Sequence, residues 1–253
     1  VAINPAESIG DPGVIHKLSV TITNNANADE EIDFTVEGFP SSSWEYCVRY
    51  SGNCLNSLNI AKGATSDFVL EITTPENEPA GPDFLTLVGA SSLNNKFEVR
   101  QSFKIITNPI YLFSVTTPSD TKTVEAGKSV VFQLKFTNLG NSPDIIDFPS
   151  PVYPSDGQNW QGAYSVSSLT LSPNESDTVY LNIDIPAGAY GGNNTITSTV
   201  KSYQCVNPPC VGQSETISFT VFIEEKAKID VKLETTAGYV TAGTLGEFKI
   251  LIT

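Results

Sequence analysis

The sequence is poor in the residues on which most enzymes and nucleic-acid-binding proteins depend. Its 253 residues include one His, 14 Lys or Arg and no Met. A single His leaves almost no material for a multi-histidine metal site or for His-dependent nucleophilic catalysis. Asp and Glu number 28, so the formal net charge is -14. This balance argues against nucleic acid or an anionic membrane surface as partner, because both need clustered basic side chains.

Long hydrophobic runs are also missing. No apolar stretch approaches the roughly 20 residues of a membrane-spanning helix, so we expect no direct membrane insertion in this segment. The chain begins at Val1 without a recognisable signal peptide. We expect either that a leader has been removed or that the sequence is a piece of a longer protein.

An internal repeat organises what is present. Residues 11–25 read DPGVIHKLSVTITNN and residues 125–139 read EAGKSVVFQLKFTNL, which places Gly13 on Gly127 at an offset of 114 residues. The ungapped alignment continues through two pairs of asparagines, Asn24 with Asn138 and Asn27 with Asn141. A third copy begins near residue 240. Such self-similarity indicates tandem domains.

The second half of each unit repeats as well. Residues 57–75 match residues 168–186, and each unit has one Trp. We therefore predict three units at 1–107, 110–223 and 228–253, the last of them incomplete. Two strands cannot bury a core alone. We expect the third unit to be completed by the rest of its own chain or by strand addition from a neighbouring subunit.

Hydrophobic periodicity predicts the fold class. Leu18, Val20 and Ile22 alternate with polar residues, and no segment sustains a 3.6-residue apolar period. About seven short amphipathic strands in ~110 residues predict an all-β protein of tandem immunoglobulin-like (Ig-like), Greek-key β-sandwich domains. The predicted core of the first domain, with counterparts in the second, consists of Leu18, Val20, Ile22, Phe34, Trp44, Phe68, Leu70 and Ile72.

The four cysteines form two close pairs, Cys47 with Cys54 and Cys205 with Cys210. Four cysteines allow three pairings; the local pairing is favoured because the pairs lie in separate repeat units, and free thiols in a reducing compartment are the alternative. Two sequons, at Asn174 and Asn193, would permit glycosylation of a secreted protein. Together these features favour an extracellular location.

The motif order resembles the tandem Ig-like repeats of prokaryotic cell-surface proteins. The matching residues are Gly13, Gly127 and Gly243, Thr23-Asn24 and Thr137-Asn138, Trp44 and Trp160, and Pro75 and Pro186. The resemblance implies a module of an archaeal or bacterial surface layer, adhesin or filament. Similar modules are also appended to secreted hydrolases. The cysteine pairs lie outside the repeat and look like staples on individual hairpins.

Several acidic residues are weak candidates for a Ca²⁺ site, since carboxylate oxygens are the ligands that Ca²⁺ prefers. They are Asp29, Glu30 and Asp33 in the first unit, and Asp144 and Asp147 in the second. The alternative, which we favour, is that they supply turn geometry and side-chain-to-backbone hydrogen bonds. No cofactor is otherwise expected.

We expect a non-enzymatic structural protein, a rod of Ig-like modules that contacts itself or neighbouring surface subunits. His16 lies on an alternating strand, where a structural role is the plain interpretation. Exposed aromatics could instead bind glycans, which would make the chain an adhesin or carbohydrate-binding region; the candidates are Tyr46, Tyr50, Tyr153, Trp160, Tyr164 and Tyr190. A third possibility is the non-catalytic arm of a secreted hydrolase.

Overall fold

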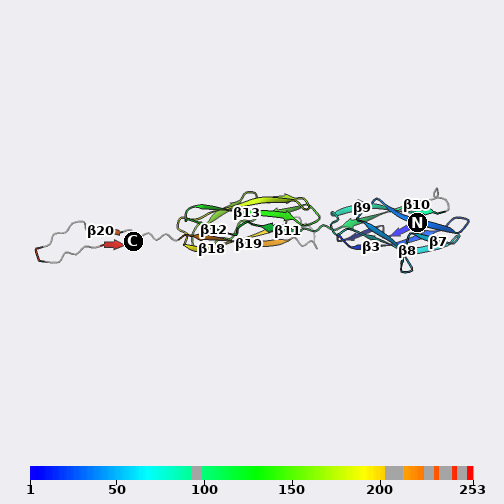
Figure 1. Cartoon of the computed structure of the whole chain (residues 1–253), viewed down its shortest axis with the longest axis horizontal. Helices are drawn as coiled ribbons and strands as arrows, with labels where there is room; N and C mark the ends of the chain where they lie inside the picture. The colour runs from blue at the N-terminus through cyan, green and yellow to red at the C-terminus, as the bar shows by residue number, and fades with distance from the viewer. Residues whose placement is uncertain (93–97, 203–212, 225–230, 234–240, 244–249, 253) are drawn as a thin grey trace.

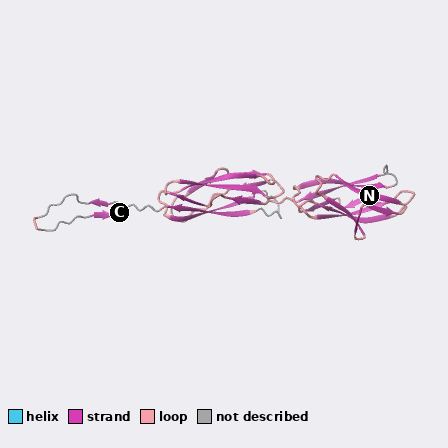
Figure 2. Cartoon of the chain, in the orientation of Figure 1, coloured by secondary structure: helices cyan, strands magenta, loops and turns pink. Residues whose placement is uncertain are grey.

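Two β-sandwiches lie end to end along the long axis of the molecule (Figure 1). The structure is a computed structural model that describes residues 1–92, 98–202, 213–224, 231–233, 241–243 and 250–252. The described residues form strands and loops without a helix (Figure 2). Accordingly, they contain no helix of the length and apolarity needed to cross a membrane.

The first domain has two five-stranded sheets, with strand orders β1-β3-β8-β5-β6 and β2-β10-β9-β4-β7. Its strands are β1 (Ala2–Asn4), β2 (Glu7–Gly10), β3 (Ile15–Thr23), β4 (Glu30–Glu37), β5 (Glu45–Tyr50), β6 (Asn53–Leu55), β7 (Ser57–Ile60), β8 (Thr65–Thr73), β9 (Gly81–Ser91) and β10 (Glu98–Thr107).

The second domain repeats this arrangement, with sheets ordered β11-β13-β17-β15 and β12-β19-β18-β14-β16. Its strands are β11 (Phe113–Thr116), β12 (Thr121–Val124), β13 (Ser129–Asn138), β14 (Asp144–Asp147), β15 (Gln161–Tyr164), β16 (Ser168–Leu171), β17 (Ser176–Asp184), β18 (Gly192–Ser202) and β19 (Ser214–Ile223).

The topology is that of tandem Ig-like sandwiches, as the sequence predicts. The number of strands exceeds the predicted seven for two reasons. The opening strand of each domain is divided between the two sheets: β1 pairs antiparallel with β3, whereas β2 pairs parallel with β10. In addition, the segment between β4 and β7 forms the β5–β6 hairpin, which joins the sheet of β8. Short, irregular segments of this kind carry too little periodicity to be recognised.

Alternation along the strands builds one core in each domain. In β3 every second residue from His16 to Ile22 is buried, and in β13 every second residue from Val130 to Asn138 is buried. All eight predicted core residues of the first domain are buried, and Trp44 and Trp160 are each 5% exposed. Each core is closed by aromatic contacts, such as Phe34 with Phe68 and Phe132 with Phe219.

The repeated asparagines that end β3 and β13 explain why the Thr-Asn pair recurs. The Asn24 side-chain amide donates to the carbonyls of Ala28 and Ile60, and its oxygen accepts from the Ala26 N–H. Asn138 makes the same three bonds with its own domain, to Ser142, Leu171 and Gly140. Both side chains thus satisfy buried backbone groups where two strands diverge.

Within the predicted third unit, the described residues include two short strands, β20 (Val231–Leu233) and β21 (Ile250–Ile252). They pair antiparallel, with Val231 opposite Ile252.

Candidate functional site

The acidic residues considered for Ca²⁺ lie on or beside β4 and β14, where serines and a backbone amide contact them. The Ser91 hydroxyl donates to a carboxylate oxygen of Glu30 at 2.5 Å, and the Ser202 hydroxyl donates to Asp144 at 2.6 Å. These two pairs occupy the same register, because Ile32 faces Ser91 and Ile146 faces Ser202. The Asp29 carboxylate accepts from the Lys62 N–H at 2.8 Å.

Asp33 is exposed on β4 and Asp147 is half-buried on β14. The described part of the chain contains no group of three or more His, Cys, Asp or Glu side chains arranged to hold a metal ion. Glu30 and Asp144 accept cross-strand hydrogen bonds from serines, and Asp29 accepts one from a backbone N–H in a turn. These are contacts of the kind expected if the acids stabilise turns and strand pairs.

Cys47 and Cys54 form a disulfide bond across the β5–β6 hairpin, with their Cα atoms 5.4 Å apart. The hairpin turns through Ser51 and Gly52, both with positive φ, as a tight two-residue connection requires. Cys205 and Cys210 lie outside the described residues. The two sequon asparagines are exposed: Asn174 lies in the turn after β16, and Asn193 lies on β18.

His16 is 3% exposed in the core of the first domain, where its Nδ1 lies 2.9 Å from the Ser8 hydroxyl. Burial lowers the pKa of its imidazole, so the neutral form is favoured. Val130 occupies the aligned position of the second domain. Because His16 is buried and the next repeat has a valine at its position, we interpret His16 as a packing residue of the core.

The aromatic residues considered for glycan binding do not gather on one face. Tyr46 donates to the Phe34 carbonyl, Tyr164 donates to Ser198, and both pack against the cores together with Tyr153. Tyr50 and Tyr190 are 36% and 64% exposed, but they belong to different domains.

A group of hydrogen bonds connects the two domains at their junction. Asn141, in the loop after β13, donates through its side-chain amide to the carbonyls of Glu78 (2.8 Å) and Asn108 (3.1 Å). Its side-chain oxygen accepts from the Ile110 N–H at 2.6 Å, and its own carbonyl accepts from the Ala80 N–H at 3.1 Å. Asn141 thus ties the linker and both domains together, and it is 9% exposed.

The linker is fixed from both sides. Asn108 donates through its backbone N–H to the Gly10 carbonyl at 2.8 Å and through its side chain to Asp11 at 2.9 Å. On the second domain, the Leu139 and Gly140 N–H groups both donate to the Leu112 carbonyl, at 2.7 and 3.1 Å. A side chain at Gly140 would overlap the Ile110 carbonyl. The close approach of linker and loop therefore requires glycine there.

Glu78 connects the junction to the core of the first domain. The Trp44 indole N–H donates to its carboxylate at 2.8 Å, while its backbone carbonyl accepts from Asn141. Burial raises the pKa of the Glu78 carboxyl; the Trp44 hydrogen bond opposes this and the Asp83 charge adds to it. The pKa of Asp83 is raised by burial as well. Trp160 of the second domain instead donates to Asp156, so the Trp44–Glu78 bond is particular to the junction.

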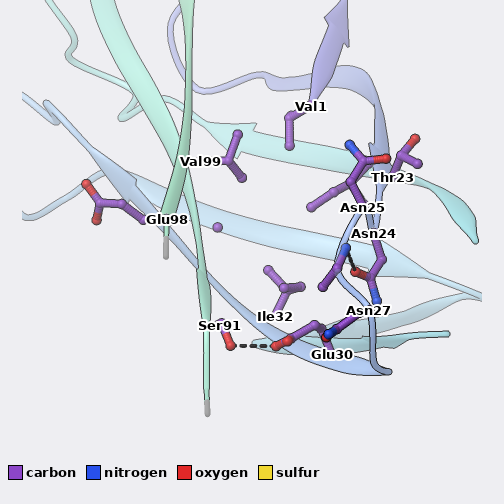
Figure 3. Close-up of a pocket in the computed structure, with 13 residues that line it drawn as sticks. Val1, Thr23, Asn24, Asn25, Asn27, Glu30, Ile32, Ser91, Glu98 and Val99 are labelled. Carbon is purple, nitrogen blue, oxygen red and sulfur yellow. Dashed lines mark hydrogen bonds between the residues drawn. The ribbon is translucent and has the colours of Figure 1, made fainter. Parts of the chain in front are cut away.

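A second feature is a cavity of about 660 Å³ at the opposite end of the first domain. Figure 3 shows Val1, Ile32 and Val99 from three different strands or strand ends around this space, with Asn24, Asn25 and Asn27 beside it. Apolar, amide and hydroxyl side chains line it together with the carboxylates of Glu30 and Glu98.

The junction could not be found from the sequence by its chemistry. Asn141 is visible there only as the repeat partner of Asn27, and Glu78 only as one acid in a loop. The sequence of that loop gives no signal for a contact with a residue 63 positions away. The signal that does exist is the repeat itself, which places Asn141 at a domain end.

No protein-family model and no curated protein sequence matches this chain. Similar solved structures include the PapD-like domain 7 of human CEP192, at 16% identity and a TM-score of 0.33 over 45% of this chain and 87% of that chain. Domains 4 and 5 of the S-layer protein SbsC are 13% identical, with a TM-score of 0.29 over 60% of this chain and 69% of that chain.

A family 123 glycoside hydrolase from Clostridium perfringens is 12% identical to this chain, with a TM-score of 0.35. The match covers 44% of this chain and 27% of the enzyme, so the chain spans well under half of the enzyme's length. These likenesses concern the fold and carry nothing about activity.

Proposed function

We propose that this chain is a non-catalytic, extracellular structural protein whose Ig-like domains form a stiff spacer at a prokaryotic cell surface. The observation that carries the proposal is the junction at Asn141. One side chain there binds three backbone groups from the first domain and the linker. Side-chain hydrogen bonds to backbone groups on both sides of a linker restrict bending in a way that a free connection does not.

Two further properties support a location outside the cell. The Cys47–Cys54 disulfide suits an oxidising compartment. The net charge of -14 keeps such a chain soluble and repels non-specific association.

The stiffness is tested by small-angle X-ray scattering of the chain in solution, combined with residual dipolar couplings from each domain. A spacer gives one extended scattering profile and a single alignment tensor shared by both domains. Two independent tensors, or scattering that requires a broad range of interdomain angles, would contradict the proposal. Antibody labelling of intact cells, with and without permeabilisation, tests the location: label that requires permeabilisation would place the chain inside.

A further inference from the structure

The division of the opening strand leaves a recess on the outer surface of the second domain. β11 ends opposite Lys135, and the chain then crosses to the other sheet, where β12 pairs with β19. Among the described residues, β13 therefore has no neighbouring strand on that side at Val131 and Gln133. A hollow of about 180 Å³, which we call the β11–β12 recess, lies at this place. Its lining residues, all of them described, are Pro118, Ser119, Lys122, Val131, Gln133 and Tyr180.

Tyr180 and Val131 give the recess an accessible apolar surface. Tyr180 of β17 lies opposite Gln133 of β13, on the outer face of the sheet, since the alternate residues Val179 and Leu181 are buried in the core. Tyr180 is 47% exposed and Val131 is 49% exposed. An accessible aromatic ring on a flat sheet face is the kind of surface on which a sugar ring can stack.

Polar groups surround this apolar surface and have no partner within the described structure. The Tyr180 hydroxyl, the Gln133 amide and the Lys122 amine form no hydrogen bond or ion pair with any described residue. The same holds for the side chain of Asn182, which lies opposite Val131 beside the recess. Donors and acceptors are thus available to a ligand without the loss of an internal hydrogen bond.

The charge at the recess is opposite to that of the chain as a whole. Lys122 lines the recess, and Lys135 is exposed on the same face of β13. Neither lysine forms an ion pair with a described residue. Asp120, in the adjoining turn, accepts a hydrogen bond from the Thr121 hydroxyl and does not line the recess. In a chain with a net charge of -14, two lysines without an acidic partner favour an anionic ligand at this place.

The corresponding face of the first domain has a different arrangement. There Glu71 forms ion pairs with Lys17 at 3.4 Å and with Arg49 at 2.7 Å. Lys17 aligns with Val131 of the second domain, and Glu71 aligns with Asn182. The first domain therefore uses this face for internal ion pairs, whereas the second domain leaves an aromatic ring and uncharged amides exposed. The fold that both domains share does not require the second arrangement.

The turn between β11 and β12 fixes the rim of the recess. The Thr117 hydroxyl donates to the Ser119 carbonyl at 2.9 Å, and the Ser119 hydroxyl donates to the Thr121 carbonyl at 2.6 Å. These bonds hold the backbone that carries Pro118 and Lys122. A rim that is ordered before the ligand arrives lowers the entropic cost of binding.

We infer that the β11–β12 recess binds one acidic sugar residue, a pyranose ring that carries a carboxylate. The apolar face of the sugar stacks on Tyr180, its carboxylate accepts a charge-assisted hydrogen bond from Lys122, and its hydroxyls bind the Gln133 amide. The volume suits a single ring, because pockets for drug-sized ligands measure roughly 300–1,000 Å³. The inference does not rest on the spacer function, which concerns only the order of the domains.

The test uses the whole chain, with galacturonate as the probe and two matched ligands at constant ionic strength. The methyl ester of galacturonate keeps the ring without the charge, and acetate keeps the charge without the ring. NMR spectra of the ¹⁵N-labelled chain are recorded during titration. We expect saturable shifts of the Gln133 side-chain amide and the Tyr180 backbone N–H, with a Kd of about 1–10 mM for galacturonate. The ester and acetate should each bind about tenfold more weakly or worse.

Two variants of the chain assign the roles of the ring and of the charge. Tyr180→Ala should weaken galacturonate binding about tenfold, and Tyr190→Ala, which removes an exposed tyrosine elsewhere in the second domain, should leave it unchanged. Lys122→Gln should reduce galacturonate binding to the level of the ester and leave ester binding unchanged. Its control is Lys201→Gln, a change at an exposed lysine of β18. The spectrum of each variant reports whether it folds.

Absence of saturable shifts at up to about 50 mM galacturonate would overturn the inference. Equal binding of the ester would overturn it as well, since the charge would then not be recognised. If acetate binds as tightly as galacturonate, or if Tyr180→Ala binds like the wild type, the recess binds small anions and the assignment to a sugar is wrong. None of these outcomes changes the residual dipolar couplings by which the spacer function is judged, so the two proposals fail separately.

Discussion

The side-chain amide of Asn141 lies 2.8 Å from the carbonyl oxygen of Glu78, and this hydrogen bond joins the second domain to the first. The same side chain also binds the linker at Asn108 and Ile110. Asn27, at the aligned position of the first domain, is exposed beside the cavity of that domain. One position of the repeat therefore faces a neighbouring domain in one unit and an open cavity in the other.

Replacement of Asn141 by alanine should loosen the junction. The variant loses three side-chain hydrogen bonds, which together contribute about 2–3 kcal/mol if each contributes an average amount. We expect the two domains of Asn141→Ala to report separate alignment tensors in residual dipolar coupling measurements. The stability of each domain should change little. Asn27→Ala is the control and should retain a common tensor; identical behaviour of the two variants would show that the Asn141 contacts do not determine interdomain order.

Replacement of Asn138 by alanine should destabilise the second domain. The change leaves the carbonyls of Ser142 and Leu171 and the N–H of Gly140 without their side-chain partner, at a cost of about 2–3 kcal/mol. Urea unfolding of the second domain can be followed by Trp160 fluorescence in a Trp44→Phe background. Asn24→Ala should produce the same loss in the first domain only, because Asn24 makes the equivalent bonds there. If either variant destabilised both domains equally, this account would be contradicted.

The stability of the first domain should fall between pH 7 and pH 5 because of His16. Burial lowers the pKa of the folded imidazole below its ordinary value. As the pH drops through that ordinary value, the unfolded chain takes up a proton that the folded chain does not, and the free energy of unfolding decreases. His16→Val removes this contribution and should flatten the pH profile relative to the wild type.

The raised pKa values of Glu78 and Asp83 affect the free energy of unfolding in the opposite direction on acidification. As the pH falls, these carboxyls take up protons at a higher pH in the folded chain than in the unfolded chain. The difference between wild type and His16→Val isolates the imidazole, because both proteins keep these acids. The measurement is the urea midpoint at several pH values, and parallel profiles for the two proteins would exclude a contribution from His16.

Removal of the Cys47–Cys54 disulfide by a Cys47→Ala/Cys54→Ala double change should destabilise the first domain by about 2 kcal/mol. The bridge closes a short loop, so the stabilisation expected from restricting the unfolded chain is at the low end of the usual range for disulfides. Differential scanning calorimetry should show a lower first transition with the second-domain transition in place. A shift of both transitions would indicate that the domains unfold as one unit.

Alternation and repetition made most of the fold predictable. Leu18, Val20 and Ile22 face the core because polar residues separate them, and the same pattern recurs in β13. The repeat also marked Asn24 and Asn138 as important. What the sequence did not indicate was the division of the opening strand between two sheets or the β5–β6 hairpin, since segments of three or four residues have no measurable period.

The junction and the cavity of the first domain could not be predicted from the sequence for a different reason. Both bring together residues far apart in the chain: Asn141 donates to the Glu78 carbonyl, and Ile22 and Val99 line the same cavity. A single sequence records the residue types but not which loops meet at a domain end. Gly89 and Val200, for example, become comparable only once strand register aligns them.

The parallel pairing of β2 with β10, repeated by β12 with β19, has a mechanical consequence. In each domain the first and last strands of a sheet run side by side in the same direction, with Lys104 opposite Glu7 and Thr220 opposite Thr121. Tension applied to the two ends of the molecule would load these strand pairs in shear. Their hydrogen bonds would then have to break together and not one after another. Each domain thus has a clamp at the point where a pulling load enters and leaves it.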